Sequence, residues 1–185
     1  MMSKICTKGY HGTIQENANK ILSEKRFHES NRENDWLGRG VYFFAYLYHA
    51  KWWITHSRFQ GKETSILQAA LEYDKEQLLD LDDPENIAVM EELVKNAVEK
   101  GANTSNSVSA DVLSVEKSKR WCFACNLYKH LFPEVGIIKY TFSPNKNRTK
   151  QYSGFGENQQ QMCVSRPEII RSIEEYTDGV GEKNG

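Results

Sequence analysis

Three short segments carry side chains that can act on a ligand, and the first two also contain glycines that let a ligand approach closely. They lie at residues 10–13, 37–43 and 161–164, and their sequences are YHGT, LGRGVYF and QMCV. A histidine ring nitrogen can hold a hydroxyl group, and an aromatic ring can stack on a flat ligand. Each segment alone also has an ordinary structural explanation, because His-Gly pairs are common in turns and aromatic strand residues are usually core.

In this order and spacing, the segments resemble the diphtheria-toxin-like and poly(ADP-ribose)-polymerase-like ADP-ribosyltransferases, whose signature is a His–Tyr–Glu triad on three strands. The resemblance covers residues 8–60 well and residues 136–176 more loosely. It implies an α+β fold with a split mixed β-sheet, flanking helices and an NAD cleft between two small sheets. We expect one such domain over residues 1–176 and a flexible tail over residues 177–185.

The resemblance also implies a role for individual residues. His11 would hydrogen-bond the ribose next to nicotinamide, and the backbone of Gly12 would pair with the nicotinamide carboxamide. Tyr42 would stack on the nicotinamide ring, with Trp52 as a second stacking aromatic. The family often has a serine where this chain has His49. The full set of expected NAD-binding residues is His11, Gly12, Thr13, Arg39, Tyr42, Trp52 and Gln159.

The third segment departs from the family pattern. The family residue is usually glutamate, and here Gln161 takes its place, with Gln159 two positions earlier. A carboxylate stabilises the oxocarbenium-like cation that forms when a glycosidic bond breaks, whereas glutamine brings no charge. We therefore expect slow turnover and single transfer, with Glu157 as a second candidate for the missing carboxylate.

The implied function is mono-ADP-ribosyltransfer from NAD to a macromolecule, carried by His11, Tyr42, Gln161 and Glu157. NAD is the co-substrate, and no metal is needed because the leaving group is already a cationic pyridinium. Family analogy suggests a toxin or defence effector, with an antitoxin as a possible partner. Three alternatives stay open: an NAD glycohydrolase, an inactive module that binds NAD or ADP-ribose, and a nucleic-acid module that ignores NAD.

Basic and aromatic residues alternate over residues 139–155, just before the third segment. This stretch holds four cations and three aromatic rings: Lys139, Lys146, Arg148, Lys150, Tyr140, Tyr152 and Phe155. Such interleaving suits single-stranded nucleic acid, through phosphate contacts and base stacking. We expect the acceptor to be nucleic acid slightly ahead of protein.

The pair Cys122 and Cys125 has the spacing of half a zinc site. A structural zinc site needs four ligands, and the other candidate ligands in the chain are His130 and the distant Cys6 or Cys163. The pair also falls inside an expected helix beside aromatic residues. We therefore expect buried packing thiols.

The elements that must position these residues follow from hydrophobic periodicity. We expect a strand at 7–10, then a helix at 15–25 with Thr13 as N-cap and Glu16 completing a capping box. A loop at 28–36 precedes a strand at 41–44 and an aromatic-rich helix at 45–58. Further strands are expected at 64–73, 78–81, 135–142, 162–164 and 169–176. Helices are expected at 86–100, ended by Gly101, and at 114–132.

The composition is that of a soluble globular chain of 185 residues, with 39% hydrophobic and 26% charged residues. No apolar run approaches the ~20 residues that span a bilayer, and the start lacks the apolar core of a signal peptide. We expect a cytoplasmic protein without membrane partners. The net charge is −1, but residues 1–61 carry nine Lys and Arg against five Asp and Glu. The positive charge therefore lies where the first two segments lie.

Overall fold

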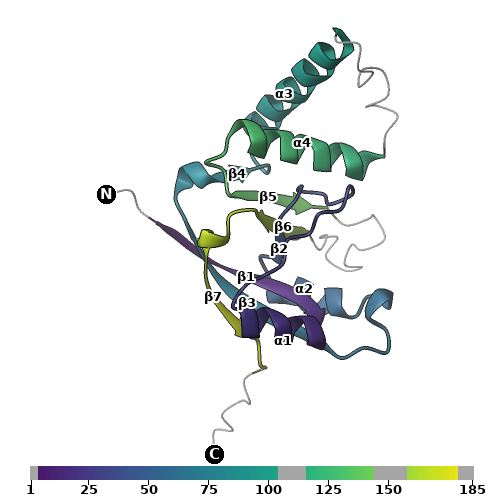
Figure 1. Cartoon of the computed structure of the whole chain (residues 1–185), viewed down its shortest axis with the longest axis vertical. Helices are drawn as coiled ribbons and strands as arrows, with labels where there is room; N and C mark the ends of the chain where they lie inside the picture. Colours follow the sequence, from purple (N-terminus) through teal and green to yellow (C-terminus); the bar gives the residue numbers. More distant parts are fainter. Residues whose placement is uncertain (1–3, 104–115, 144–157, 179–185) are drawn as a thin grey trace, which may run out of the picture.

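The structure, a computed structural model, describes residues 4–103, 116–143 and 158–178. A seven-stranded sheet and four α-helices make up these residues, so the fold is α+β (Figure 1). The strands are β1 (Ile5–Ile14), β2 (Val41–Phe44), β3 (Thr64–Tyr73), β4 (Leu78–Asp80), β5 (Ile137–Phe142), β6 (Gln159–Val164) and β7 (Ile170–Glu175). The helices are α1 (Gln15–Glu24), α2 (Leu47–Ile54), α3 (Pro84–Asn103) and α4 (Lys117–Leu131), and a 3₁₀ turn, η1 (Ser57–Phe59), follows α2.

The strands lie in the order β4-β5-β6-β2-β1-β3-β7. Among the described strands only β4 and β5 pair in parallel, so the sheet is mixed, as expected, and largely antiparallel. The expectation of two separate small sheets is wrong, because β1 and β2 join the two halves. That joint is narrow: β1 pairs with β3 from Ile5 to Ile14, but with β2 only through Tyr10 and Phe44. Beyond this pair the two strands diverge.

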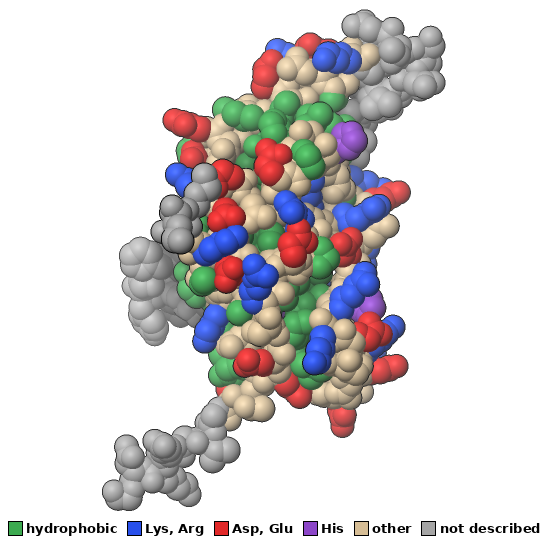
Figure 2. Space-filling model, turned by 60° about the vertical axis from the view of Figure 1, so that its left-hand side comes forward, with side chains coloured by type: hydrophobic (Ala, Val, Ile, Leu, Met, Phe, Trp, Pro, Cys, Tyr) green, Lys and Arg blue, Asp and Glu red, His purple; other side chains and the backbone are tan. Residues whose placement is uncertain are grey.

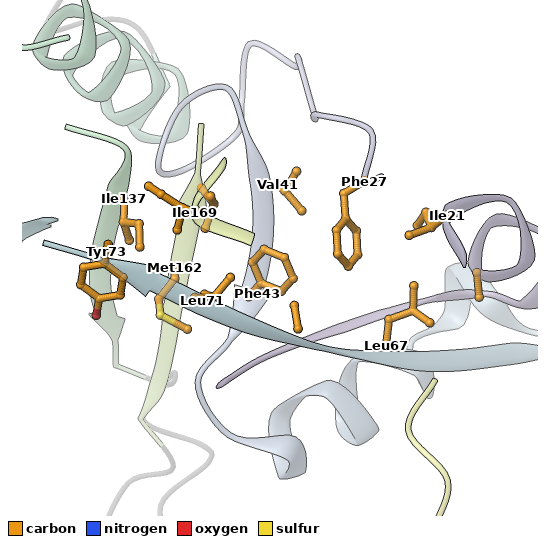
Figure 3. Close-up of a cluster of buried hydrophobic side chains, with 13 residues drawn as sticks. Ile21, Phe27, Val41, Phe43, Leu67, Leu71, Tyr73, Ile137, Met162 and Ile169 are labelled. Carbon is orange, nitrogen blue, oxygen red and sulfur yellow. The ribbon is translucent and has the colours of Figure 1, made fainter. Parts of the chain in front are cut away.

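Alternating side chains on the strands build a separate core on each face of the sheet. Phe43 of β2 and Leu67 of β3 pack with Ala18 and Ile21 of α1 on one face. Figure 3 shows Phe27, Phe43, Val41 and Ile21 gathered there around the same interior. The neighbouring strand residues point the other way: Phe44 and Ile66 pack with Ala50 of α2, and Ile138 and Cys163 pack with Cys125 of α4. The helices thus cover both faces (Figure 1).

Several expected boundaries were wrong. Ile14, not Thr13, is the N-cap of α1, and no side chain caps the helix, so the capping box with Glu16 does not form. The reason is that β1 continues through Thr13 to Ile14 and pairs there with β3. Helix α3 continues past Gly101 to Asn103, because a single glycine costs a helix only about 1 kcal/mol. The expected helix at 45–58 is shorter, at Leu47–Ile54.

Most of the basic and aromatic stretch at 139–155 and most of the expected tail at 177–185 lie outside the described residues. Strand β6 begins at Gln159, earlier than expected, since Gln159 and Gln160 pair with Phe142 and Thr141 of β5. No helix among the described residues is long and apolar enough to cross a membrane. On the face drawn in Figure 2, basic and acidic side chains are interspersed.

The loop entering β2 depends on its two glycines. Gly38 has a φ of 78°, and a Cβ placed there would lie 2.5 Å from the Oδ1 of Asn126. That oxygen accepts a hydrogen bond from the backbone N–H of Arg39, at 2.8 Å. At Gly40 a Cβ would lie 2.6 Å from the Sγ of Cys163. The loop therefore packs closely against both α4 and β6, and this contact fixes the start of β2.

We predict that Gly38→Ala destabilises the protein by about 2–4 kcal/mol, since it combines left-handed backbone strain with the loss of the Asn126 contact. Gly61→Ala is the matched control, because Gly61 has a φ of 74° but open space around its Cβ position. It should cost only the strain, about 1–2 kcal/mol. Urea unfolding of both variants checks this. Equal losses would contradict the packing described for Gly38.

Candidate functional site

A cleft of about 850 Å³ opens where β1 and β2 diverge. Its walls include the end of β1, all of β2, the start of β6, helix α2 with η1, and the loop at 28–36. Seven residues expected from the sequence lie along it: His11, Gly12, Thr13, Tyr42, Trp52, Gln159 and Gln161. A second cavity of about 360 Å³, beside α1 and β7, contains none of the seven. The structure therefore gathers most of the expected site in one place.

The His11 ring bridges the gap between the diverging strands. Its Nδ1 lies 2.8 Å from the carbonyl oxygen of Tyr42. A carbonyl oxygen only accepts, so Nδ1 carries the proton and Nε2 is left as an acceptor. Burial lowers the pKa of His11 below its usual 6.5, and the nearby Arg58 guanidinium lowers it further. The imidazole is therefore neutral near pH 7, with a lone pair available to a ligand hydroxyl.

Strand alternation alone would have kept His11 away from Tyr42 and Gln161. His11 pairs with Leu67, so its side chain belongs to the α1 face, where it packs edge-on against Phe27 and Phe43. Tyr42 and Gln161 belong to the opposite face, because they are in register with Cys163 and Phe44. His11 from one face and Tyr42 and Gln161 from the other still share the cleft, because the hydrogen-bond ladder between β1 and β2 ends just before His11. The gap exposes both faces at one opening.

The Tyr42 hydroxyl is fully used inside the protein. It donates to the carbonyl of Gly38 at 2.7 Å and accepts from the N–H of Leu37 at 2.8 Å. Burial strongly raises the pKa of this phenol, so it stays protonated. Only the ring of Tyr42 is thus available to a ligand, and the hydroxyl holds the glycine loop in place.

The three consecutive glutamines divide between the two faces of β6. Gln159 and Gln161 line the cleft, as residues two apart on a strand must share a face. Gln160 points away, with its Nε2 3.2 Å from the Oγ1 of Thr141 and 3.3 Å from the Oδ2 of Asp82. Glu157, the expected second carboxylate, lies outside the described residues. Of the described residues that line the cleft, Asp35 alone carries a carboxylate.

Helix α2 brings two tryptophans to the cleft. Both Trp52 and Trp53 line it and both are partly buried. Gly12 is needed for the approach of this helix, because a Cβ there would lie 2.8 Å from the Cγ2 of Ile54 and 3.1 Å from the Cδ1 of Trp53. His49, at the position of the family serine, is buried.

Arg39 does not join the cleft. Its Nε donates to the Oδ1 of Asn31 at 2.8 Å, and its carbonyl accepts from Lys129. The expected role of Arg39 in binding the cofactor stays a prediction, and in this structure its side chain is bonded to the 28–36 loop. Arg39 thus links that loop to α4.

The described part of the basic and aromatic stretch has structural contacts. Lys139 forms an ion pair with Asp80 at 2.6 Å, and the Tyr140 ring packs edge-on against Phe142. These two residues therefore do not present a free nucleic-acid surface. The other five residues of the stretch lie outside the described residues.

Sequence reasoning missed the basic residues of the cleft. The loop at 28–36 supplies His28 and Arg32, and the segment after α2 supplies His56, Arg58 and Lys62. The available signal was the local excess of positive charge over residues 1–61.

The paired cysteines are packing residues, as expected. Cys122 and Cys125 are buried on α4, and both are free thiols. Burial raises the pKa of Cys125 to about 12, so it stays a neutral thiol. Among the described residues no group of three or more His, Cys, Asp or Glu could hold a metal ion.

The chain is similar to an uncharacterised protein of Methanocaldococcus jannaschii. The two are 25% identical over 193 aligned positions, which cover 95% of this chain and 90% of that protein. No protein-family model matches the chain. No solved structure matches it either.

We predict that His11 makes stability depend on pH. The pKa of His11 is lower in the folded protein than in the unfolded chain, so the unfolded chain binds the proton first as pH falls below about 6.5. The free energy of unfolding should therefore fall, by at most about 1.4 kcal/mol per pH unit, until pH passes the folded-state pKa.

The control is His11→Asn, whose amide can still donate to the Tyr42 carbonyl but does not titrate. Urea unfolding at pH 7.5 and pH 5.5 should show a smaller loss in this variant than in the wild type. Identical losses in both proteins would contradict a neutral, partly buried His11.

Proposed function

We propose that the protein is an NAD-dependent mono-ADP-ribosyltransferase whose active site is the cleft between β1 and β2. The observation that carries this proposal is the meeting of His11, Tyr42 and Gln161 in one cleft, from three strands that are neighbours in the sheet. Their order along the chain is the one that the His–Tyr–Glu resemblance implies. The fold of that family is part of the same proposal, and the single residue pair that joins β1 to β2 within the one sheet supports it.

The geometry suggests a role for each side chain. The unprotonated Nε2 of His11 accepts a hydrogen bond from a hydroxyl of the nicotinamide ribose. The rings of Tyr42 and Trp52 stack on the nicotinamide. The Gln161 carboxamide holds the 2′-hydroxyl of the same ribose. These contacts orient the ribose carbon C1′ toward an acceptor.

In the reaction, the bond between C1′ and the nicotinamide nitrogen breaks, and its electron pair leaves with neutral nicotinamide. The acceptor nucleophile attacks C1′ with its own electron pair and releases a proton to a base or to water. Because Gln161 carries no charge, the oxocarbenium-like state is less stabilised than beside a carboxylate. We therefore expect slow transfer, and the carboxylate of Glu157 stays the second candidate for this role.

A macromolecule is the proposed acceptor, with nucleic acid ahead of protein, and a toxin or defence effector held by an antitoxin is the proposed context. That context rests on family analogy. The glutamine at the third position favours a second candidate function, a module that binds NAD or ADP-ribose without cleaving it. An NAD glycohydrolase would differ from both by passing ADP-ribose to water.

We predict that the purified protein transfers label from adenylate-labelled NAD to one of three pools: RNA, single-stranded DNA or cell protein. His11→Ala and Gln161→Ala should each lower transfer at least tenfold, because they remove ribose contacts that orient C1′. Gln160→Ala is the matched control, because its side chain lies on the other face of β6. It should keep wild-type transfer.

Nicotinamide release measured in the same reactions separates the alternatives. Release without any acceptor would indicate a glycohydrolase. NAD that binds but stays intact in every pool would contradict the transferase and favour the binding module. Equal losses in the Gln160 and Gln161 variants would contradict the assignment of Gln161 to the site.

A further inference from the structure

The walls of the cleft formed by η1, the segment after it and the 28–36 loop carry a group of cationic side chains. These cationic residues are Arg32, Arg58 and Lys62. Asp35 is the carboxylate that the described residues place beside them, and one of its oxygens already accepts the backbone N–H of Arg32 at 2.8 Å. This part of the cleft therefore attracts anions, unlike the mixed surface of Figure 2.

The Arg58 guanidinium is held by aromatic rings. Its Cζ lies 3.9 Å from the centroid of the Trp53 ring and 4.9 Å from that of Phe59. Such cation–π contacts fix the plane of the guanidinium while leaving its N–H donors free for another group. Among the described residues, no carboxylate forms an ion pair with Arg58 or with Arg32.

Arg32 is held on the facing wall. The backbone of Ser30 exchanges two hydrogen bonds with that of Gly40, at 2.8 and 3.2 Å, so the 28–36 loop is tied to the start of β2. The thiol of Cys122 donates to the carbonyl of Arg32 at 3.4 Å. Partial burial lowers the pKa of Arg58, and the positive charge of Arg32 lowers it further. Two arginines that line one cleft, without an ion pair to a carboxylate among the described residues, indicate a site that an anion completes.

We propose that Arg32 and Arg58 form a subsite in this cleft for the diphosphate group of a nucleotide. The proposal rests on the proposed function in naming NAD as that nucleotide, and it assigns the part of NAD that these residues bind. Two planar guanidinium groups match the paired oxygens of a diphosphate. The cleft volume of about 850 Å³ is within the range of sites that hold whole cofactors.

The test is calorimetric titration of the full chain with ADP, with adenosine as the uncharged comparison. ADP should bind at least tenfold more tightly than adenosine, and the difference should shrink in 0.5 M NaCl. Arg58→Gln and Arg32→Gln should each weaken ADP at least tenfold and leave adenosine unchanged. Arg58→Lys should recover part of the loss, because lysine restores the charge but not the planar fork.

Lys8→Gln is the matched control, since it removes one positive charge from an exposed residue of β1 that does not line the cleft. It should bind ADP as the wild type does. Thermal unfolding of each variant shows whether a loss of binding comes from a loss of fold. If Arg58→Gln and Arg32→Gln stay folded and bind ADP normally, the proposal is overturned.

Nucleic-acid phosphates share this chemistry, so a single-stranded oligonucleotide is titrated in parallel. If the oligonucleotide binds tightly through both arginines and ADP does not bind, the diphosphate subsite is overturned. The arginines would then bind the phosphates of a nucleic-acid acceptor. Failure of the proposed function has a different signature: ADP binds through the two arginines, yet NAD stays intact with every acceptor. Conversely, if Arg58→Gln cleaves NAD with an unchanged KM for NAD, the subsite proposal is overturned and the transferase proposal stands.

Discussion

The hydrogen bond from the His11 ring to the Tyr42 carbonyl is the interaction on which the cleft depends. Beyond Tyr10 and Phe44, strands β1 and β2 no longer pair, and backbone groups at the widening gap lose their ladder partners. The imidazole spans this gap at 2.8 Å and satisfies one of them. The same bond fixes which ring nitrogen carries the proton, so one contact both joins the halves of the sheet and prepares an acceptor for a ligand.

The other elements support this junction from each side. The carbonyl of Tyr42 can accept from His11 only if β2 begins at a fixed position. The hydroxyl of Tyr42 fixes that position through its hydrogen bonds with the backbone of Leu37 and Gly38. Helix α4 supports the same loop through Asn126 and Lys129. On the far side, Gly12 lets α2 approach closely enough to put its tryptophans at the opening. The walls of the cleft are thus held by packing that involves no ligand.

Much of this was predictable from the sequence, because strand and helix periodicity is local. The strand at Thr64–Tyr73 and the buried thiols of α4 follow from such patterns. The end of the β1–β2 ladder does not, since register between strands depends on the whole sheet. Three identical glutamines carry no alternation, so the sequence could not show that Gln160 faces Asp82. Nor could it show that Arg32 and Arg58, 26 positions apart, line the same cleft.

We propose that the gap bridged by His11 is where a dinucleotide binds. The most direct test is a crystal structure with a carbocyclic NAD analogue, which keeps the shape of NAD but cannot lose nicotinamide by forming an oxocarbenium ion. In that structure we expect the nicotinamide to stack on Tyr42, its ribose to lie between His11 and Gln161, and the diphosphate to contact Arg58. An analogue seated instead in the smaller cavity beside α1, or none bound at saturating concentration, would contradict it.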